Sequence, residues 1–189
     1  MKRCDWVPKG NRLYEEYHDK EWGVPVYEDQ TLFEFLILEG AQAGLSWETI
    51  LKRREGYREL FANFDPYIVA SYTKEDVERL RLDARIIRNR KKIESAIKNA
   101  QCFLEIVNSH GSFSSYFWDY TEGLVIQSRL KTIKEAPVQT ELSQKISKDL
   151  KKRGFSFVGP TIIYAYMQAV GMVNDHTVDC DSFALLEKN

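Results

Sequence analysis

The chain has 189 residues, of which 43% are hydrophobic and 29% are charged, with a formal net charge of −1. This composition excludes a disordered chain, and no apolar run reaches the ~20 residues that span a bilayer. The near-neutral charge argues against a surface that is basic all over, although a local basic patch can still bind nucleic acid. The N-terminus lacks the apolar core of a signal peptide, and three cysteines do not make a disulfide framework, so we expect a cytoplasmic protein.

Apolar residues spaced three and four apart recur along the chain, and strand-like alternation is scarce, so the predicted fold class is all-α. No repeat, low-complexity tract or linker divides the sequence. We expect one compact unit over residues 1–189, or two lobes that share a core. The predicted helices are, in chain order, 13–20, 29–43, 46–61, a short one from 66, 74–82, 88–107, 113–117, 142–152 and 160–170. Residues 122–137 show no clear pattern.

The helix predicted over 29–43 carries apolar side chains almost all the way round, so it should be central and buried. Glu39 follows Leu32, Phe35 and Leu36 by seven, four and three residues, which places it on their face. A buried carboxylate needs a partner, because an unpaired buried charge costs several kcal/mol. Two interpretations stay open: a structural ion pair inside the fold, or a ligand site.

Aromatic residues gather in the first quarter of the chain. Tyr14, Tyr17 and His18 share one helical face at i, i+3 and i+4. Such clusters usually belong to a core, but the polar tips of Tyr and Trp also suit a ligand site. The cluster consists of Trp6, Tyr14, Tyr17, Trp22 and Trp47.

A basic run coincides with a break between two predicted helices. Seven basic residues lie between Arg79 and Lys92, against one acid, Asp83. The N–H groups at the start of the second helix can hold a phosphate, and Arg88 adds charge. The alternative is a plain helical corner with a solvated basic rim. A second basic group consists of Lys148, Lys151, Lys152 and Arg153.

Two thiols and two imidazoles lie near the two ends of the chain: Cys4 and His18, then His176 and Cys180. This set suits tetrahedral Zn²⁺, and the four-residue step from His176 to Cys180 predicts one side of a helical turn. Closing so long a loop costs about 5 kcal/mol, whereas a structural zinc supplies roughly 10–16 kcal/mol. The alternative is that these are ordinary residues; a Cys4–Cys180 disulfide does not fit a reducing compartment.

Five segments in order resemble one family, the DNA-3-methyladenine glycosylase I family of helix-hairpin-helix DNA glycosylases. The similarity covers nearly the whole chain. The segments are RCxW at 3–6, YHDxEWGxP at 17–25, LEGAQAGLSW at 38–47, KKRGFxFVG at 151–159 and NDH at 174–176. The resemblance implies that residues 1–189 form a single catalytic unit that excises 3-methyladenine from double-stranded DNA. A monomer is the default expectation for an enzyme that must encircle part of a duplex.

The resemblance also implies roles for individual residues. A structural zinc would join the terminal segments through Cys4, His18, His176 and Cys180. Glu39 would be catalytic, and the base-binding residues would be Tyr17, Trp47, Trp6, Tyr14 and Trp22. The DNA-binding residues would be Gln42, Gly44, Leu45, Arg85, Arg88, Lys91 and Arg153. The hairpin at 83–88 lacks the glycine that usually lets the backbone approach a DNA phosphate closely. The positive charge of Arg85 would attract the phosphate instead.

The implied mechanism extrudes the damaged nucleotide, at a cost of a few kcal/mol, and lets Leu45 fill the gap. Glu39 would stabilise the cationic base, and water would attack the sugar to leave an abasic site. No lysine is placed for a Schiff base, so lyase activity is not expected. The alternative is a non-catalytic module that binds DNA or senses damage and whose terminal segments are joined by zinc. A metal-dependent nuclease is disfavoured, because no carboxylate cluster suggests a catalytic metal site.

Overall fold

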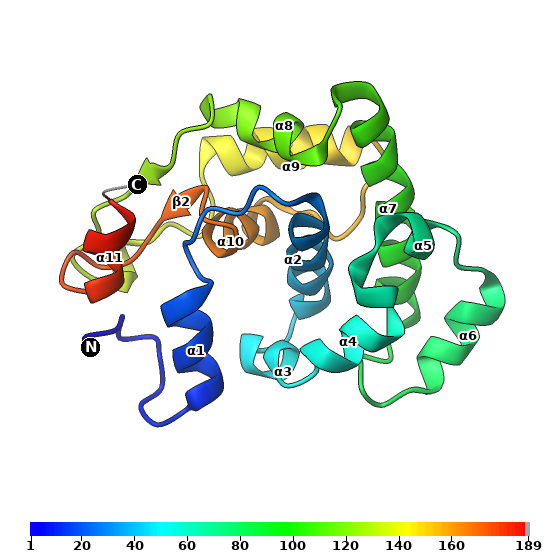
Figure 1. Cartoon of the computed structure of the whole chain (residues 1–189), viewed down its shortest axis with the longest axis horizontal. Helices are drawn as coiled ribbons and strands as arrows, with labels where there is room; N and C mark the ends of the chain where they lie inside the picture. The colour runs from blue at the N-terminus through cyan, green and yellow to red at the C-terminus, as the bar shows by residue number, and fades with distance from the viewer. Residues whose placement is uncertain (188–189) are drawn as a thin grey trace.

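The computed structural model describes residues 1–187, which are mostly helical, as the sequence predicts (Figure 1). The helices are α1 (Arg12–Lys20), α2 (Asp29–Gln42), α3 (Trp47–Leu51), α4 (Arg54–Leu60), α5 (Pro66–Ala70), α6 (Lys74–Leu82), α7 (Arg90–His110), α8 (Phe113–Trp118), α9 (Glu141–Lys152), α10 (Pro160–Ala169) and α11 (Asp181–Leu186). Short 3₁₀ turns lie at Ala62–Phe64, Asp119–Thr121 and Ile133–Glu135. None of the helices in residues 1–187 is long and apolar enough to cross a membrane.

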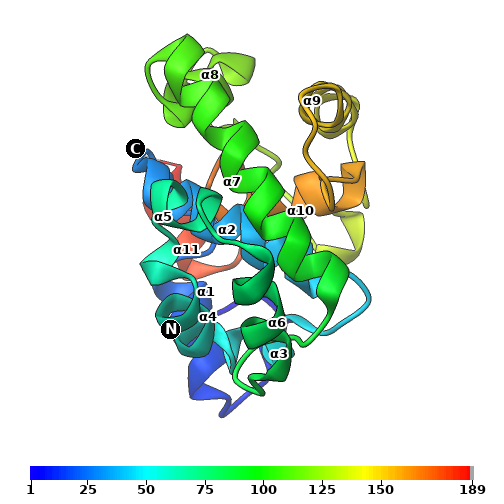
Figure 2. The ribbon, with the colours of Figure 1, turned by 90° about the vertical axis from the view of Figure 1, so that its right-hand side faces the viewer.

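Helix α2 is the central element, as its apolar pattern predicts. Figure 1 shows it between α10 and α7, and Figure 2 shows α7 running across it. All residues from 32 to 41 are buried, and the hydroxyl of Tyr166 on α10 donates to the carbonyl of Leu32 at 3.0 Å. The Glu28 side chain caps the start of α2 by accepting from the N–H groups of Gln30 and Thr31. Glu39 is therefore held on a helix that is fixed on both sides.

The chain between 46 and 61 forms two helices, so the prediction of one helix there is wrong. α3 ends at Leu51 and α4 starts at Arg54, with Arg53 at φ −107° and ψ 0° between them. The break allows Arg54 to turn inward, where its guanidinium binds Glu34 on α2 at 2.6 Å and Glu21 at 2.6 Å. A buried ion pair between helices is a tertiary contact, which the spacing within one segment does not encode.

A two-stranded parallel sheet joins a segment without a clear sequence pattern to the C-terminal region. β1 (Ile126–Gln127) pairs with β2 (Val173–Asn174), and Leu130 forms a bridge with Thr177. Strands of two residues are too short to show alternation, so periodicity cannot predict them.

The two ends of the chain lie side by side. The N–H of Asp181 donates to the carbonyl of Lys2 at 3.0 Å, and the N–H of Lys2 donates to the Asp181 carboxylate at 2.8 Å. However, the helical turn predicted from His176 to Cys180 is wrong: the segment passes through the β-bridge and a turn, and Cys180 is the N-cap of α11. Hydrogen bonding to residue 130, far away in the chain, decides this local conformation.

Candidate functional site

An aromatic cavity of about 300 Å³ lies among α1, α2, α3 and α10. Seven residues singled out in the sequence line it: Trp6, Tyr14, Tyr17, Trp22, Glu39, Gln42 and Trp47. Four further lining residues were missed: Ile133, Ala136, Ala165 and Gln168. The first two lie in the stretch without a pattern, whereas Ala165 and Gln168 lie three residues apart on the half-buried side of α10.

Glu39 lies in this cavity without a protein partner. It is 4% exposed, and its carboxylate forms no hydrogen bond or ion pair with the described residues. Burial raises the pKa of Glu39 to about 8. The structural ion pair that the sequence left open is therefore absent at Glu39 among residues 1–187, and the carboxylate is open to a ligand.

The aromatic rings form walls around the carboxylate. The rings of Tyr17 and Trp47 lie 5.4 Å apart, and those of Trp6 and Trp22 lie 4.9 Å apart. The indole N–H groups of Trp6 and Trp47 are buried without a hydrogen-bond partner in the described part of the chain. Unmatched buried donors cost free energy, so they point to a ligand that accepts hydrogen bonds. The cavity suits a flat, polar, aromatic molecule that carries positive charge.

Three of the four predicted metal ligands come together. The ligand atoms of Cys4, His18 and Cys180 all lie within 4.8 Å of one another and are buried. His18 Nδ1 is hydrogen-bonded to Asp19 at 2.9 Å, and Arg3 holds that carboxylate at 2.7 Å. Such an outer partner fixes the orientation of a metal-binding imidazole and leaves Nε2 for the ion. This cluster can hold a metal ion.

His176 is adjacent to the cluster but is not part of the group of three. Its ring lies 4.9 Å from that of His18, and its Nδ1 is 3.0 Å from Asn174 Oδ1. Its Nε2 is buried and has no hydrogen-bond partner among residues 1–187. Burial lowers the pKa of His176 to about 4, so the ring is neutral, as a metal ligand must be. An orphaned nitrogen beside two thiols and an imidazole fits the fourth position of a tetrahedral zinc site.

Gly23 makes room for that imidazole. It has φ +79°, and a Cβ at this position would lie 2.7 Å from His176 Cε1. A side chain at residue 23 would therefore be strained and would displace the histidine.

The loop after α2 projects an apolar side chain beside the cavity. Gly44 has φ +77° with open space around it, and the next residue, Leu45, is 40% exposed. The ammonium of Lys92 donates to the carbonyls of Ala41 and Ala43 at 2.8 and 2.7 Å, which braces the loop from α7. Since Gln42 lines the cavity, Leu45 is held close to its mouth.

The predicted DNA-binding cations differ in whether their charges are already paired within the protein. Arg85 forms an ion pair with Asp83 at 2.8 Å and another with Glu59. Arg88 and Lys91 are exposed and have no charged partner within residues 1–187. The turn between α6 and α7 contains no residue with positive φ, so its lack of glycine causes no strain.

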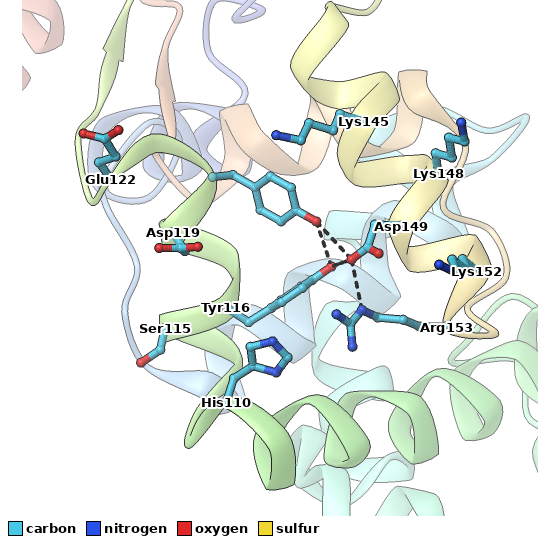
Figure 3. A pocket seen from close by; sticks show the side chains of 11 residues that line it. His110, Ser115, Tyr116, Asp119, Glu122, Lys145, Lys148, Asp149, Lys152 and Arg153 are labelled. Carbon is cyan, nitrogen blue, oxygen red and sulfur yellow. Dashed lines mark hydrogen bonds and ion pairs between the residues drawn. The ribbon is translucent and has the colours of Figure 1, made fainter.

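Arg153 lies at the end of α9 and is anchored rather than mobile. Figure 3 shows its guanidinium meeting Asp149, which also accepts a hydrogen bond from Tyr116. Arg153 Nε is 2.9 Å from the Asp149 carboxylate, and its guanidinium carbon lies 4.9 Å from the centre of the Tyr116 ring. These residues belong to a separate charged cavity of about 910 Å³ between α8 and α9, which contains none of the other predicted site residues.

Helices α9 and α10 pack together, and the loop between them lies against Gly40 of α2, the residue after Glu39. A Cβ at Gly40 would be 3.3 Å from Phe157 Cβ, so glycine permits this close approach. Arg153 therefore lies at a loop that reaches the residue next to the candidate catalytic carboxylate.

Comparison with known proteins gives a consistent result. A family model described as methyladenine glycosylase matches residues 6–184. The chain is 49% identical over 180 residues to DNA-3-methyladenine glycosylase 1 of Escherichia coli strain K12, covering 95% of this chain and 96% of that protein. It is 44% identical to the DNA-3-methyladenine glycosylase of Haemophilus influenzae, covering 94% and 96%.

Solved structures agree with this assignment. A Staphylococcus aureus 3-methyladenine DNA glycosylase I, whose structure concerns 3-methyladenine recognition, superposes with a TM-score of 0.92 at 38% identity, covering 95% of each chain. The family resemblance drawn from the five sequence segments is thus confirmed. The chain belongs to the methyladenine glycosylase family.

Proposed function

We propose that this protein is a monofunctional DNA-3-methyladenine glycosylase that hydrolyses the N-glycosidic bond of 3-methyladenine in duplex DNA. The observation that carries the proposal is Glu39, a buried carboxylate without a protein partner in a cavity walled by Tyr17 and Trp47. The names of the relatives agree with it. We further propose that it acts as a monomer in the cytoplasm, a compartment compatible with its three free cysteines.

Methylation gives the base a positive charge and makes it a good leaving group. The extruded base would stack against Tyr17 and Trp47, which contributes about 1–3 kcal/mol, with a cation–π component. The ionised Glu39 would accept hydrogen bonds from the base edge and balance its charge. A neutral adenine would leave the negative charge of the buried Glu39 carboxylate without a counter-charge. Glu39 would therefore also disfavour binding of the normal base. Water then attacks the sugar.

The raised pKa of Glu39 predicts how activity depends on pH. Because the acid form dominates below pH 8 in the free protein, kcat/KM should increase as pH rises from 6 towards 8 and then level off. Single-turnover release of 3-methyladenine between pH 6 and 9, at enzyme concentrations too low to saturate the DNA, measures this. Glu39→Gln should abolish the rise. A wild-type profile that is flat across this range would show that Glu39 is not the group that must ionise.

The proposed DNA contacts are Leu45, which would fill the vacated stack, and the basic residues Arg85, Arg88, Lys91 and Arg153. Arg88→Ala should weaken binding to undamaged duplex and reduce the magnitude of the salt-dependence slope by about 1, because one phosphate contact is lost. Arg85→Ala is the matched comparison and should have a smaller effect, since its charge is already paired with Asp83 and Glu59. Fluorescence anisotropy at several salt concentrations measures both slopes. Equal slopes for the two variants would contradict this ranking.

We also propose that Cys4, His18, His176 and Cys180 hold one structural zinc ion. When bound, zinc would supply folding free energy and no chemistry, because four protein ligands leave no open position. Its ligands would then hold α1, which carries Tyr17, against the C-terminal segment.

The alternative function is a module that binds damaged DNA without cutting the N-glycosidic bond. The unpaired Glu39 favours catalysis, because a binder does not need a buried carboxylate in a base-sized cavity. Chromatography of the bases released from methylated DNA decides between the two. Free 3-methyladenine supports the glycosylase, whereas bound but unmodified DNA would overturn it.

A further inference from the structure

Gln168 is a cavity residue to which nothing above assigns a role. It lies on α10 and shares the cavity with Glu39 of α2 and with Trp6 of the N-terminal segment. We propose that the amide oxygen of Gln168, oriented by Asp175, recognises the 6-amino group of adenine and selects against bases that carry a 6-oxo group. This inference rests on the proposed function and adds the group that sets base identity.

Asp175 determines which end of the amide faces the protein. It is completely buried, and its Oδ2 accepts hydrogen bonds from Gln168 Nε2 at 2.6 Å and from the Tyr164 hydroxyl at 2.7 Å. Because this oxygen accepts from both groups, it is the nitrogen of the Gln168 amide that faces Asp175. Burial and the neighbouring Asp175 both raise the pKa of Tyr164, which therefore remains a donor to the same oxygen. The reversed amide would place two acceptors in contact.

The amide oxygen of Gln168 is consequently directed away from Asp175. It accepts no hydrogen bond from any residue of the described chain, and it is not sealed in the interior. The backbone of Gln168 is also fixed, because its carbonyl accepts from the N–H of Gly23 at 3.0 Å. Gln168, a residue of the cavity lining, thus carries an acceptor with a fixed orientation.

Gln42 provides the contrast within the same cavity. Its side-chain amide forms no hydrogen bond with the residues that the structure describes, so it can turn either end towards a ligand. A group that can rotate does not distinguish a donor from an acceptor. Gln168 can, because its rotation would break the bond to Asp175.

The chemistry of the bases matches this fixed acceptor. The 6-amino group of adenine donates, whereas the 6-oxo group of guanine or hypoxanthine accepts. A 6-oxo base would set its oxygen against the Gln168 oxygen and leave both without donors, and buried polar groups left unpaired give strong discrimination. Glu39 would therefore respond to the charge of the base, and Gln168 would add to the discrimination between a 6-amino and a 6-oxo group.

The test uses two free bases, 3-methyladenine and 3-methylhypoxanthine, which differ in the 6-amino or 6-oxo group and in the additional ring N–H of the 6-oxo base. Their dissociation constants are measured by quenching of the indole fluorescence at the cavity, for the wild type and for Gln168→Met. We expect the wild type to bind 3-methyladenine more tightly than 3-methylhypoxanthine. In the variant the ratio of the two dissociation constants should be smaller by at least about tenfold. Gln101→Met is the matched control, since Gln101 is exposed, donates to the Ala70 carbonyl and does not line this cavity; its preference should equal that of the wild type.

Asp175→Asn tests the positioning role. The asparagine amide can donate to Gln168, which frees the Gln168 amide to turn, so the preference should fall although Gln168 is still present. If Asp175 had a purely structural role, the substitution would weaken the binding of both bases equally and leave the ratio of their dissociation constants unchanged. Gln168→Ala, which removes the amide without filling its space, carries the same expectation as Gln168→Met if the latter does not fold.

The outcomes separate this inference from the proposed function. An unchanged ratio in folded Gln168→Met or Gln168→Ala, with 3-methyladenine still released from methylated DNA by the wild type, overturns the role of Gln168 alone. A wild type that releases no 3-methyladenine overturns the proposed function. A reduced ratio in both the Gln168 and Asp175 variants supports the inference.

Discussion

Glu39→Gln is expected to reduce excision of 3-methyladenine by about 10²–10³-fold, the effect of removing one strong electrostatic contact to a transition state. The glutamine has the same shape but cannot balance the positive charge of the extruded base. The measurement is the single-turnover rate of base release from methylated duplex DNA at pH 8. Glu105→Gln, an exposed position on α7, is the matched control and should leave the rate unchanged.

The same substitution should stabilise the fold at alkaline pH. Because folding raises the pKa of Glu39 from 4.5 to about 8, the folded state holds the proton more tightly than the unfolded state. Stability contributed by this group is therefore lost as pH rises from 4.5 to 8. Glu39→Gln has no such loss, so its Tm should exceed that of the wild type at pH 9, with a smaller difference at pH 5. A less active variant that is also less stable at pH 9 would indicate a structural role instead.

Removing a proposed zinc ligand is expected to have the largest effect on stability. Cys4→Ala and His176→Ala should each lower the Tm by about 10 °C or more, because each kcal/mol of lost stability shifts the Tm of a domain of this size by ~2–4 °C and the loss of a zinc ligand costs several kcal/mol. Zinc content, measured by atomic absorption, should fall in the same variants from one ion per chain. A chelator should reproduce the loss of stability in the wild type.

Cys102→Ala is the control for the loss of a buried thiol, since Cys102 is 1% exposed and lies outside the cluster. It should retain the zinc. If Cys4→Ala loses zinc while His176→Ala keeps both zinc and Tm, then His176 is not a ligand and the orphaned Nε2 needs another explanation. If no variant changes either quantity, the zinc assignment is wrong.

Much of the candidate site could be recognised from residue spacing. The apolar stripe around Glu39 indicated a buried carboxylate, and the aromatic residues of the first quarter do line the cavity with it. Several helix starts also depend on local residues: the side chains of Ser46, Asp65 and Thr73 cap α3, α5 and α6. These features depend on residues close together in the chain, where spacing fixes geometry.

What the sequence alone determined was the helical class, the central helix with its acidic residue, and the four candidate ligands at the chain ends. Tertiary structure decided the rest, because these features depend on contacts between distant residues. The break before Arg54 lets it reach Glu34, the extended path at His176 follows pairing with residue 130, and Arg85, in the turn before α7, is paired with Glu59 of α4. The direction of the Gln168 amide depends on Asp175, and that Glu39 has no partner could be seen only when every neighbouring side chain was in place.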